Sequence, residues 1–83
     1  MQTIVPRRWT VHSSEDLGRA IAGVREARGM TQEELARATD LNRSYLAMLE
    51  TGSDALVIER ALRALRRMGA TVTVTLPDDD VAA

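Results

Sequence analysis

Apolar residues recur at helical spacing after residue 13 and define the first long element of the chain. The residues of this apolar face are Leu17, Ala20, Ile21 and Val24. Their spacing of three or four residues places them on one side of a helix. Ser13 and Asp16 have the spacing of a capping box, and Gly29 is a typical residue just beyond a helix end. The pattern therefore predicts a helix over about 14–28.

The segment 31–52, TQEELARATDLNRSYLAMLETG, contains two helix starts and two helix stops. Thr31 and Glu34 form a second capping box, and the apolar face that follows loses its phase before residue 42. Asn42 is a suitable N-cap for another helix, which Gly52 ends. We therefore expect two short helices that meet at a tight turn, instead of one long helix.

A fourth helix is predicted after Ser53 and Asp54, a polar pair that can start it. Its apolar stripe consists of Ile58, Ala61, Leu62 and Leu65. The stripe ends near Met68 and Gly69, and the arginines of this segment lie largely outside it.

Residues 71–76, TVTVTL, change from helical spacing to strict alternation, which predicts a strand. The apolar residues on one face of this strand, which we assign to dimerisation, are Val72, Val74 and Leu76. A single strand leaves its backbone hydrogen bonds unsatisfied, so pairing with the same strand of a second subunit is the simplest solution. The alternative is pairing with residues 3–5 or 9–11, within one chain or across two, and a mixed sheet would contain both arrangements.

The 83 residues carry a net charge of -1, and all 11 basic residues are arginines. This balance excludes a uniformly basic nucleic-acid binder, so any phosphate-binding surface must be local. The chain has no cysteine, and its one histidine, His12, lacks clustered carboxylates. No catalytic grouping or glycine-rich phosphate loop is recognisable. We therefore expect no enzymatic activity, no metal and no cofactor.

The same sequence features set the expected organisation of the chain. No apolar run approaches the roughly 18 residues that span a bilayer, so a cytoplasmic location without membrane contact is expected. The segments expected are an N-terminal arm over 1–12, a helical domain over 13–69, a dimerisation strand over 70–77 and an acidic, disordered tail over 78–83.

The segment 31–52 resembles the helix-turn-helix of the XRE family, the type of the phage Cro and repressor proteins. The resemblance covers about residues 17–65 and depends on the glutamine after the second cap, the Glu-Leu-Ala run and the Leu-Glu-x-Gly exit together. The strand after the fourth helix makes the chain most similar to HipB-type antitoxins. This implies a mainly α fold, a four-helix lambda-repressor-like domain followed by a C-terminal β-strand that pairs across a homodimer.

The second short helix of a helix-turn-helix enters the major groove. Leu46 and Leu49 occupy its inward side, so the opposite face is predicted to read bases. The candidate base contacts are Arg43, Ser44, Ala47 and Met48. The candidate phosphate contacts are Arg28, Thr31, Gln32, Arg37, Asn42 and Tyr45, with Arg7 and Arg8 as further candidates. The phosphate contact of Gln32 and a structural ion pair between Arg25 and Glu50 are implied by the resemblance.

These features predict a sequence-specific transcriptional repressor that binds double-stranded DNA with an inverted-repeat operator as a homodimer. The resemblance further implies an antitoxin that represses its own operon and holds a HipA-like kinase toxin. The alternatives are a stand-alone phage-like repressor and a module of helix-turn-helix shape that binds protein instead of DNA.

Overall fold

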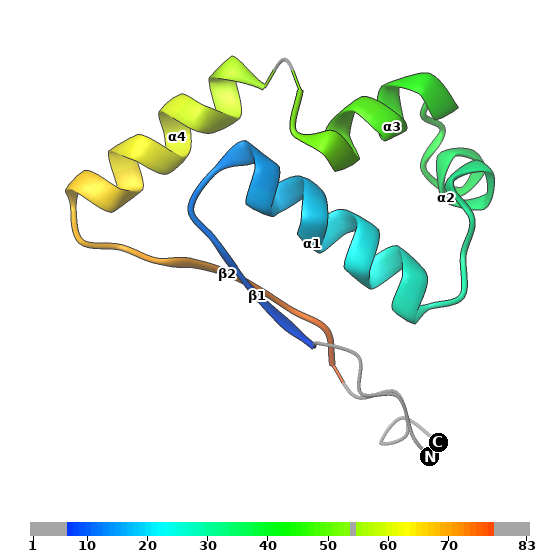
Figure 1. Cartoon of the computed structure of the whole chain (residues 1–83), viewed down its shortest axis with the longest axis horizontal. Coiled ribbons are helices and arrows are strands. Elements are labelled where there is room, and N and C mark those ends of the chain that lie inside the picture. The colour runs from blue at the N-terminus through cyan, green and yellow to red at the C-terminus, as the bar shows by residue number, and fades with distance from the viewer. Residues whose placement is uncertain (1–6, 54, 78–83) are drawn as a thin grey trace.

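The computed structural model describes residues 7–53 and 55–77. Its elements are β1 (Arg8–Val11), α1 (Ser14–Ala27), α2 (Gln32–Thr39), α3 (Arg43–Thr51), α4 (Leu56–Arg67) and β2 (Val72–Thr75). In Figure 1, α1 lies in the centre with α3 and α4 on one side of it and the two strands on the other. The predicted mainly helical fold with a strand after the last helix is confirmed. The expectations for residues 1–6 and for the tail at 78–83 lie outside the described residues.

The helix starts follow the polar residues that the sequence offers as caps. Thr31 accepts a hydrogen bond from the Glu34 amide at 3.1 Å while the Glu34 carboxylate accepts one from the Thr31 amide at 2.8 Å, which completes the capping box of α2. Asn42 accepts hydrogen bonds from the amides of Ser44 and Tyr45 in the first turn of α3. The predicted box at Ser13 is only half formed, because the Asp16 carboxylate accepts from the His12 amide instead.

The helical conformation is interrupted between α2 and α3 at Asp40, which adopts a left-handed conformation with φ 61°. A short polar side chain such as Asp tolerates this region better than most residues do. The amide of Leu41 then donates to the carbonyl of Ala36 at 2.9 Å, which satisfies an otherwise unpaired carbonyl at the helix end. One continuous helix through this segment is therefore excluded, and the two-helix prediction holds.

The start of α4 differs from the prediction. The helix begins at Leu56, and its N-cap residue, Ala55, has no side chain that could make a capping hydrogen bond. The hydroxyl of Ser53 lies 2.8 Å from that of Thr51 at the end of α3, so it is engaged with the preceding helix. Asp54, the other predicted cap, lies outside the described residues.

The strands β1 and β2 form an antiparallel pair in which Arg8 faces Thr75 and Val11 faces Val72. This intrachain pairing is the alternative partner that the sequence left open at residues 9–11, while pairing across a dimer stays a prediction. The amide of Leu76 extends the ladder by donating to the carbonyl of Arg7 at 2.8 Å. Hydrogen-bonded pairs alternate along such a ladder. The residues of this segment whose backbone groups point to the outer edge of β2 are therefore Thr71, Thr73 and Thr75.

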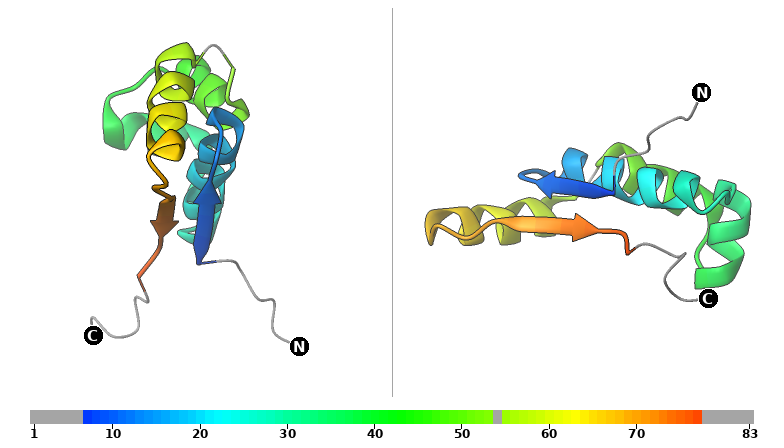
Figure 2. Two further views of the ribbon diagram at one scale, coloured as in Figure 1. Left: turned by 90° about the vertical axis from the view of Figure 1, so that its left-hand side faces the viewer. Right: turned by 90° about the horizontal axis from the view of Figure 1, so that it is seen from below.

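The core forms where the sheet, α1 and α4 meet, and its buried centre is Val11, Ala20 and Leu62. The side chains packed against this centre are Trp9, Leu17, Ile58, Val72 and Val74. The predicted apolar face of the last strand is therefore turned into the chain's own core, where Leu76 is also buried. A partner would meet the backbone edge of β2, which no other described element flanks in either view of Figure 2.

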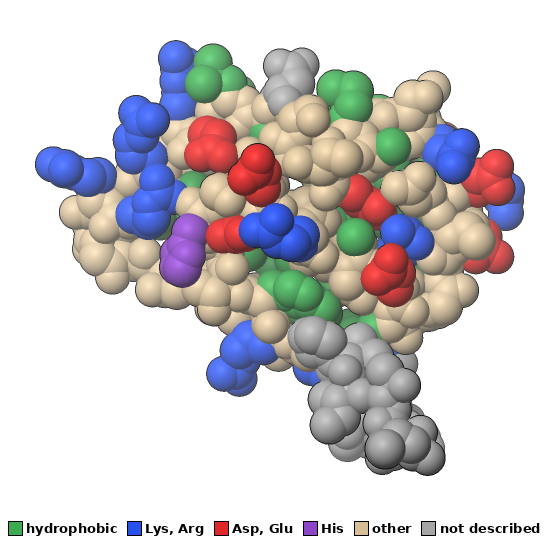
Figure 3. All heavy atoms as spheres, viewed as in Figure 1, with side chains coloured by type: hydrophobic (Ala, Val, Ile, Leu, Met, Phe, Trp, Pro, Cys, Tyr) green, Lys and Arg blue, Asp and Glu red, His purple; other side chains and the backbone are tan. Residues whose placement is uncertain are grey.

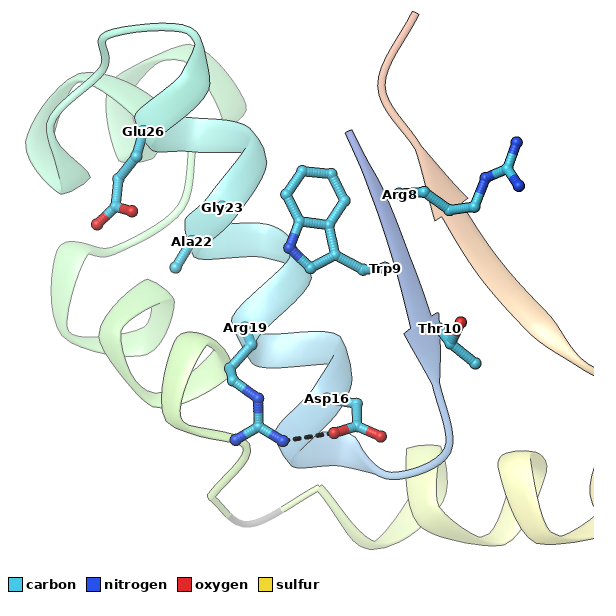
Figure 4. Close-up of a pocket in the computed structure, with 8 residues that line it drawn as sticks. All are labelled: Arg8, Trp9, Thr10, Asp16, Arg19, Ala22, Gly23 and Glu26. Atoms are coloured by element: carbon cyan, nitrogen blue, oxygen red, sulfur yellow. Dashed lines mark hydrogen bonds and ion pairs between the residues drawn. The ribbon is translucent and has the colours of Figure 1, made fainter. Parts of the chain in front are cut away.

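Two glycines on α1 mark close approaches that a side chain would prevent. A Cβ at Gly18 would lie 2.4 Å from the carbonyl oxygen of Glu50, so α1 and α3 touch there through their backbones. A Cβ at Gly23 would lie 2.5 Å from the indole of Trp9, which covers this glycine (Figure 4). The same view shows β1 running between α1 and β2, which leaves β2 as the open edge strand.

Candidate nucleic-acid interface

Helix α3 is anchored on one side and open on the other. Leu46 is only 2% exposed and fixes the inner side of the helix. Of the predicted base-reading residues, Arg43, Ser44 and Met48 are exposed and Ala47 is partly buried. Tyr45 keeps half of its surface exposed at the flank. The structure therefore brings all four predicted base-reading side chains to one accessible helix face.

The N-terminal ends of α2 and α3 offer backbone amides for phosphate binding. The carboxamide oxygen of Asn42 accepts hydrogen bonds from the amides of Ser44 at 2.7 Å and Tyr45 at 3.3 Å. Thr31 is exposed and already caps α2 through its hydroxyl oxygen. At this end of α2, phosphate binding would therefore depend on backbone amides that the cap leaves free.

An ion-pair cluster fixes the angle of α3 against the two preceding helices. The guanidinium of Arg25 donates to both carboxylate oxygens of Glu50, at 2.6 and 3.1 Å, and to the carbonyl of Met30 at 2.8 Å. The side chains of Arg25 and Glu50 are only 13% and 7% exposed. The predicted pair of α1 and α3 therefore lies in direct contact, and it also holds the loop that leads into α2.

Gln32 joins the same cluster, because its side-chain amide donates to the Glu50 carboxylate at 2.8 Å. A carboxamide nitrogen has a second hydrogen to donate, so this contact leaves one donor for a phosphate. Burial opposes ionisation of Glu50, but the hydrogen bonds from Arg25 and Gln32 outweigh it, and the pKa of Glu50 lies below its ordinary value. The hydrogen bond to Glu50 likewise raises the pKa of Arg25. The cluster therefore stays charged at neutral pH.

The charges around the interface are mixed. Arg28 and Arg37, two of the predicted phosphate contacts, are exposed beside α2. The exposed Glu33 lies in the first turn of the same helix. Figure 3 shows acidic and basic side chains interspersed at the α2 and α3 end of the molecule. Binding of DNA would therefore depend on a few placed arginines and amides more than on a broad positive surface.

Two surface hollows were not anticipated from the sequence. One, of about 390 Å³, lies at the corner of α3 and α4 and has an apolar rim formed by Tyr45, Met48, Leu56 and Val57. Its signal in the sequence was the apolar pair at the start of α4, outside the predicted stripe. The other, of about 550 Å³, lies beside Trp9 and is lined by charged residues of β1 and α1 (Figure 4).

A carboxylate of α4 was also missed. The carboxylate of Glu59 accepts hydrogen bonds from the amide of Ser14 at 2.8 Å and from its hydroxyl at 2.7 Å, so it caps the first turn of α1 from another helix. These hydrogen bonds lower the pKa of Glu59. The available signal was that Glu59 is the one acid in a helix otherwise rich in arginine.

The described residues define a helical domain in which a short helix, braced by two others, presents an open face for DNA. A helix-turn-helix family model matches residues 21–74, which is most of the chain. The chain therefore belongs to the helix-turn-helix family of the XRE type, a family of DNA-binding regulators. No curated protein and no solved structure matches it.

The described residues form neither a membrane-spanning helix nor a cluster of metal ligands. Within 7–53 and 55–77, no helix is long and apolar enough to cross a membrane. Over the same residues, no group of three or more His, Asp or Glu side chains could hold a metal ion.

Proposed function

We propose that this chain is a sequence-specific transcriptional repressor that reads an inverted repeat as a homodimer in the cytoplasm. The observation that carries the proposal is the open face of α3, which is held at a fixed angle by the Arg25–Glu50 pair. A fixed recognition helix is what direct reading of base edges requires. In the dimer, two such helices would lie near 34 Å apart, or a multiple of that, to enter grooves on one side of the duplex.

Arg43 is the residue most suited to reading a base. It lies in the first turn of α3, is exposed, and carries a planar fork that matches guanine O6 and N7. Gln32, Asn42 and the amides of the two helix starts would position the domain on phosphates. Because these contacts release counterions, affinity would fall as salt rises.

Removal of the Arg43 fork tests the proposal. In fluorescence anisotropy with DNA from upstream of its own gene, Arg43→Ala should weaken specific binding by about 1–3 kcal/mol, or roughly 5- to 150-fold. Arg19→Ala removes the same charge from an exposed position of α1 and should leave specific binding unchanged. Binding without sequence preference by the unaltered protein at moderate salt would overturn the proposal.

The dimer that we propose forms through the outer edge of β2. Its support is the set of backbone groups at Thr71, Thr73 and Thr75, which point away from β1 and find no partner among the described residues. Unpaired edge groups favour addition of another strand. Two threonine-rich edges related by a two-fold axis would also bring threonine side chains into favourable cross-strand pairs.

The finer part of the proposal is that the protein is the antitoxin of an operon that it represses, with a HipA-like kinase toxin as its partner. Its support is the strand that follows the helix-turn-helix, an order that resembles HipB-type antitoxins. Co-purification with the product of a neighbouring kinase-like gene, followed by a footprint on the shared promoter, tests it. Absence of such a gene would favour a stand-alone repressor.

A second candidate function is protein binding through the same region. The apolar hollow at the α3–α4 corner favours it, because Leu56 and Val57 are 58% and 79% exposed beside the recognition helix. Large exposed apolar side chains in one place are typical of interaction sites. Under this alternative, Val57→Ser would abolish the complex with the protein partner, whereas Arg43→Ala would leave that complex intact. Neither substitution would change the affinity of the protein for DNA.

A further inference from the structure

The polar face of α4 is strongly basic and has no role in the interface described above. The exposed cations of this helix are Arg60, Arg63, Arg66 and Arg67, against one acid, Glu59. The Glu59 carboxylate is engaged with Ser14 of α1. Among the described residues, no carboxylate lies within ion-pair distance of these arginines. Figure 3 shows arginine side chains gathered over α4.

The basic end of α4 lies at the start of β2, since α4 ends at Arg67 and β2 begins at Val72. The strand then runs away from α4 toward the opposite end of the sheet (Figure 1). The acidic run Asp78, Asp79 and Asp80 follows Pro77 at that far end. Within one subunit, β2 therefore leads the chain away from the arginines before the aspartates follow in the sequence.

A two-fold axis at the outer edge of β2 would reverse this relation. In the register that uses all the outward-facing threonines, Thr73 faces its own copy and Thr71 faces Thr75 of the second copy. In this register the end of the second copy's β2 lies beside the start of β2, and α4 ends at Arg67, shortly before that start. A register shifted by two residues moves the second strand by only about 7 Å along the first. Both registers bring the end of one β2, which the aspartates follow in sequence, close to the basic end of α4 in the other subunit.

We infer that the acidic segment 78–80 of each subunit docks on the arginine face of α4 in the other subunit. This inference rests on the strand dimer proposed above and names the contact that orients it. Opposite charges on segments that the symmetry brings together favour antiparallel association and disfavour a parallel one, in which like charges would meet. The contact also gives a role to the arginines at the C-terminal end of α4, which are more numerous than favourable interaction with the helix dipole requires.

The measurement is the dissociation constant of the homodimer, by sedimentation equilibrium of the full chain at low and moderate salt. Asp79→Asn with Asp80→Asn should weaken the dimer about threefold to thirtyfold at low salt, as expected for a few exposed ion pairs counted twice. Arg63→Gln with Arg67→Gln should weaken it similarly. The matched control, Glu26→Gln with Glu33→Gln, removes two exposed acids of α1 and α2 and should have no such effect.

A charge exchange separates a direct contact from a general change in net charge. Arg67→Glu alone should weaken the dimer, and Asp79→Arg added to it should restore much of the affinity, because every copy then carries both changes. Failure of this rescue together with unchanged dissociation in the neutral variants would overturn the inference. Loss of operator affinity in the α4 variants, with an unaltered dimer, would overturn it also and assign these arginines to DNA.

The variant Thr73→Pro separates failure of this inference from failure of the strand dimer. This substitution removes the backbone N–H of residue 73, which points to the outer edge of β2, and leaves the hydrogen bonds between β1 and β2 in place. If Thr73→Pro leaves the dimer intact, or if the protein is monomeric at all concentrations, the proposed strand dimer is wrong and the tail contact falls with it. If Thr73→Pro dissociates the dimer while the tail and α4 variants do not weaken it, only the tail contact is wrong.

Discussion

Glu50 receives hydrogen bonds from Arg25 of α1 and Gln32 of α2, so one carboxylate ties three helices together. Its removal would leave the Arg25 guanidinium desolvated, with only the exposed Glu26 carboxylate, at 3.8 Å, as a counter-charge. A pair of this kind contributes little when it is compared with an apolar replacement, but its disruption from one side is costly. The position of α3 therefore depends on a side chain that is itself only 7% exposed.

We predict that Glu50→Ala lowers the free energy of unfolding by about 3 kcal/mol, the lower end of the range for a broken buried pair. Urea denaturation followed by circular dichroism measures this change. Arg19→Ala breaks an ion pair whose partners are 69% and 22% exposed, and it should cost less than about 1 kcal/mol. Equal losses in the two variants would mean that the Glu50 pair is effectively solvated.

Glu59 makes the free energy of unfolding depend on pH in the acidic range. Its pKa is lowered in the folded state by the hydrogen bonds from Ser14, so near pH 4 the unfolded chain binds more protons than the folded one. This contribution to stability is complete above about pH 4.3, the ordinary value for Glu, and is lost as the pH falls through the lowered pKa. The pKa of Asp16 is also lowered in the folded state, by the hydrogen bond that its carboxylate accepts from the His12 amide. Asp16 therefore contributes to the pH dependence of stability with the same sign.

We predict that Glu59→Gln makes the acid limb of the stability profile shallower than in the unaltered protein. The amide oxygen of Gln can still accept from Ser14, but it has no charge to lose. Urea midpoints measured from pH 7 to pH 3 give the two profiles. Glu33→Gln, at an exposed position of α2, is the control for loss of one carboxylate. Parallel profiles for Glu59→Gln and the unaltered protein would contradict the assignment.

At the scale of elements, α1 and α3 are in backbone contact at Gly18. This contact sets how far the recognition helix stands from the rest of the domain. Alanine within a helix normally stabilises relative to glycine by roughly 0.5–1 kcal/mol. At Gly18 the added Cβ would lie 2.4 Å from the Glu50 carbonyl oxygen and 2.6 Å from that of Leu49, so the two helices would have to separate.

We predict that Gly18→Ala destabilises the domain by about 1–3 kcal/mol, the usual cost of overpacking, and weakens specific DNA binding. Thermal unfolding and anisotropy measure the two effects. Gly23→Ala is the comparison, because its nearest neighbour is the half-buried side chain of Trp9, which can rotate away. A stabilising effect of Gly18→Ala would show that the α1–α3 contact is looser than described.

At the scale of the whole molecule, the open edge of β2 is where we propose that two subunits associate. The inner edge of the strand is paired with β1, and its apolar face lies on the core. Association through β2 therefore requires no unfolding of the subunit. It also leaves the α3 face free for DNA, since α3 lies on the opposite side of α1 from the sheet (Figure 1).

We predict that Thr73→Pro shifts the protein to the monomer in sedimentation equilibrium while its helical circular dichroism is retained. Proline removes one outward amide from an edge position, where it is tolerated best. Val74→Pro removes an amide that pairs with β1 and should instead destabilise the fold. The same low stability in both variants would indicate that the outer edge is not where the subunits meet.

The prediction of the fold from sequence succeeded where local contacts decide the structure. The caps at Thr31 and Asn42 and the stop at Gly52 each involve residues within a few positions of one another, so their pattern can be recognised in the chain. The predicted start of α4 was wrong because two local contacts compete for the Ser53 hydroxyl, and the sequence pattern does not show that its contact with Thr51 forms in place of a cap on α4.

The sequence by itself determined that the helix is interrupted between α2 and α3 and that Arg43 lies on the exposed side of α3. It also determined that apolar and polar residues alternate along the last strand. Only the tertiary structure decided that this strand pairs with β1, that Val72 and Val74 face the chain's own core, and that Gln32 binds Glu50. Helix ends and faces follow from spacings of a few residues, whereas a strand partner or a buried ion pair joins positions far apart in the chain. Such pairs are selected by the packing of the whole domain, because burial and hydrogen bonding have to be satisfied together.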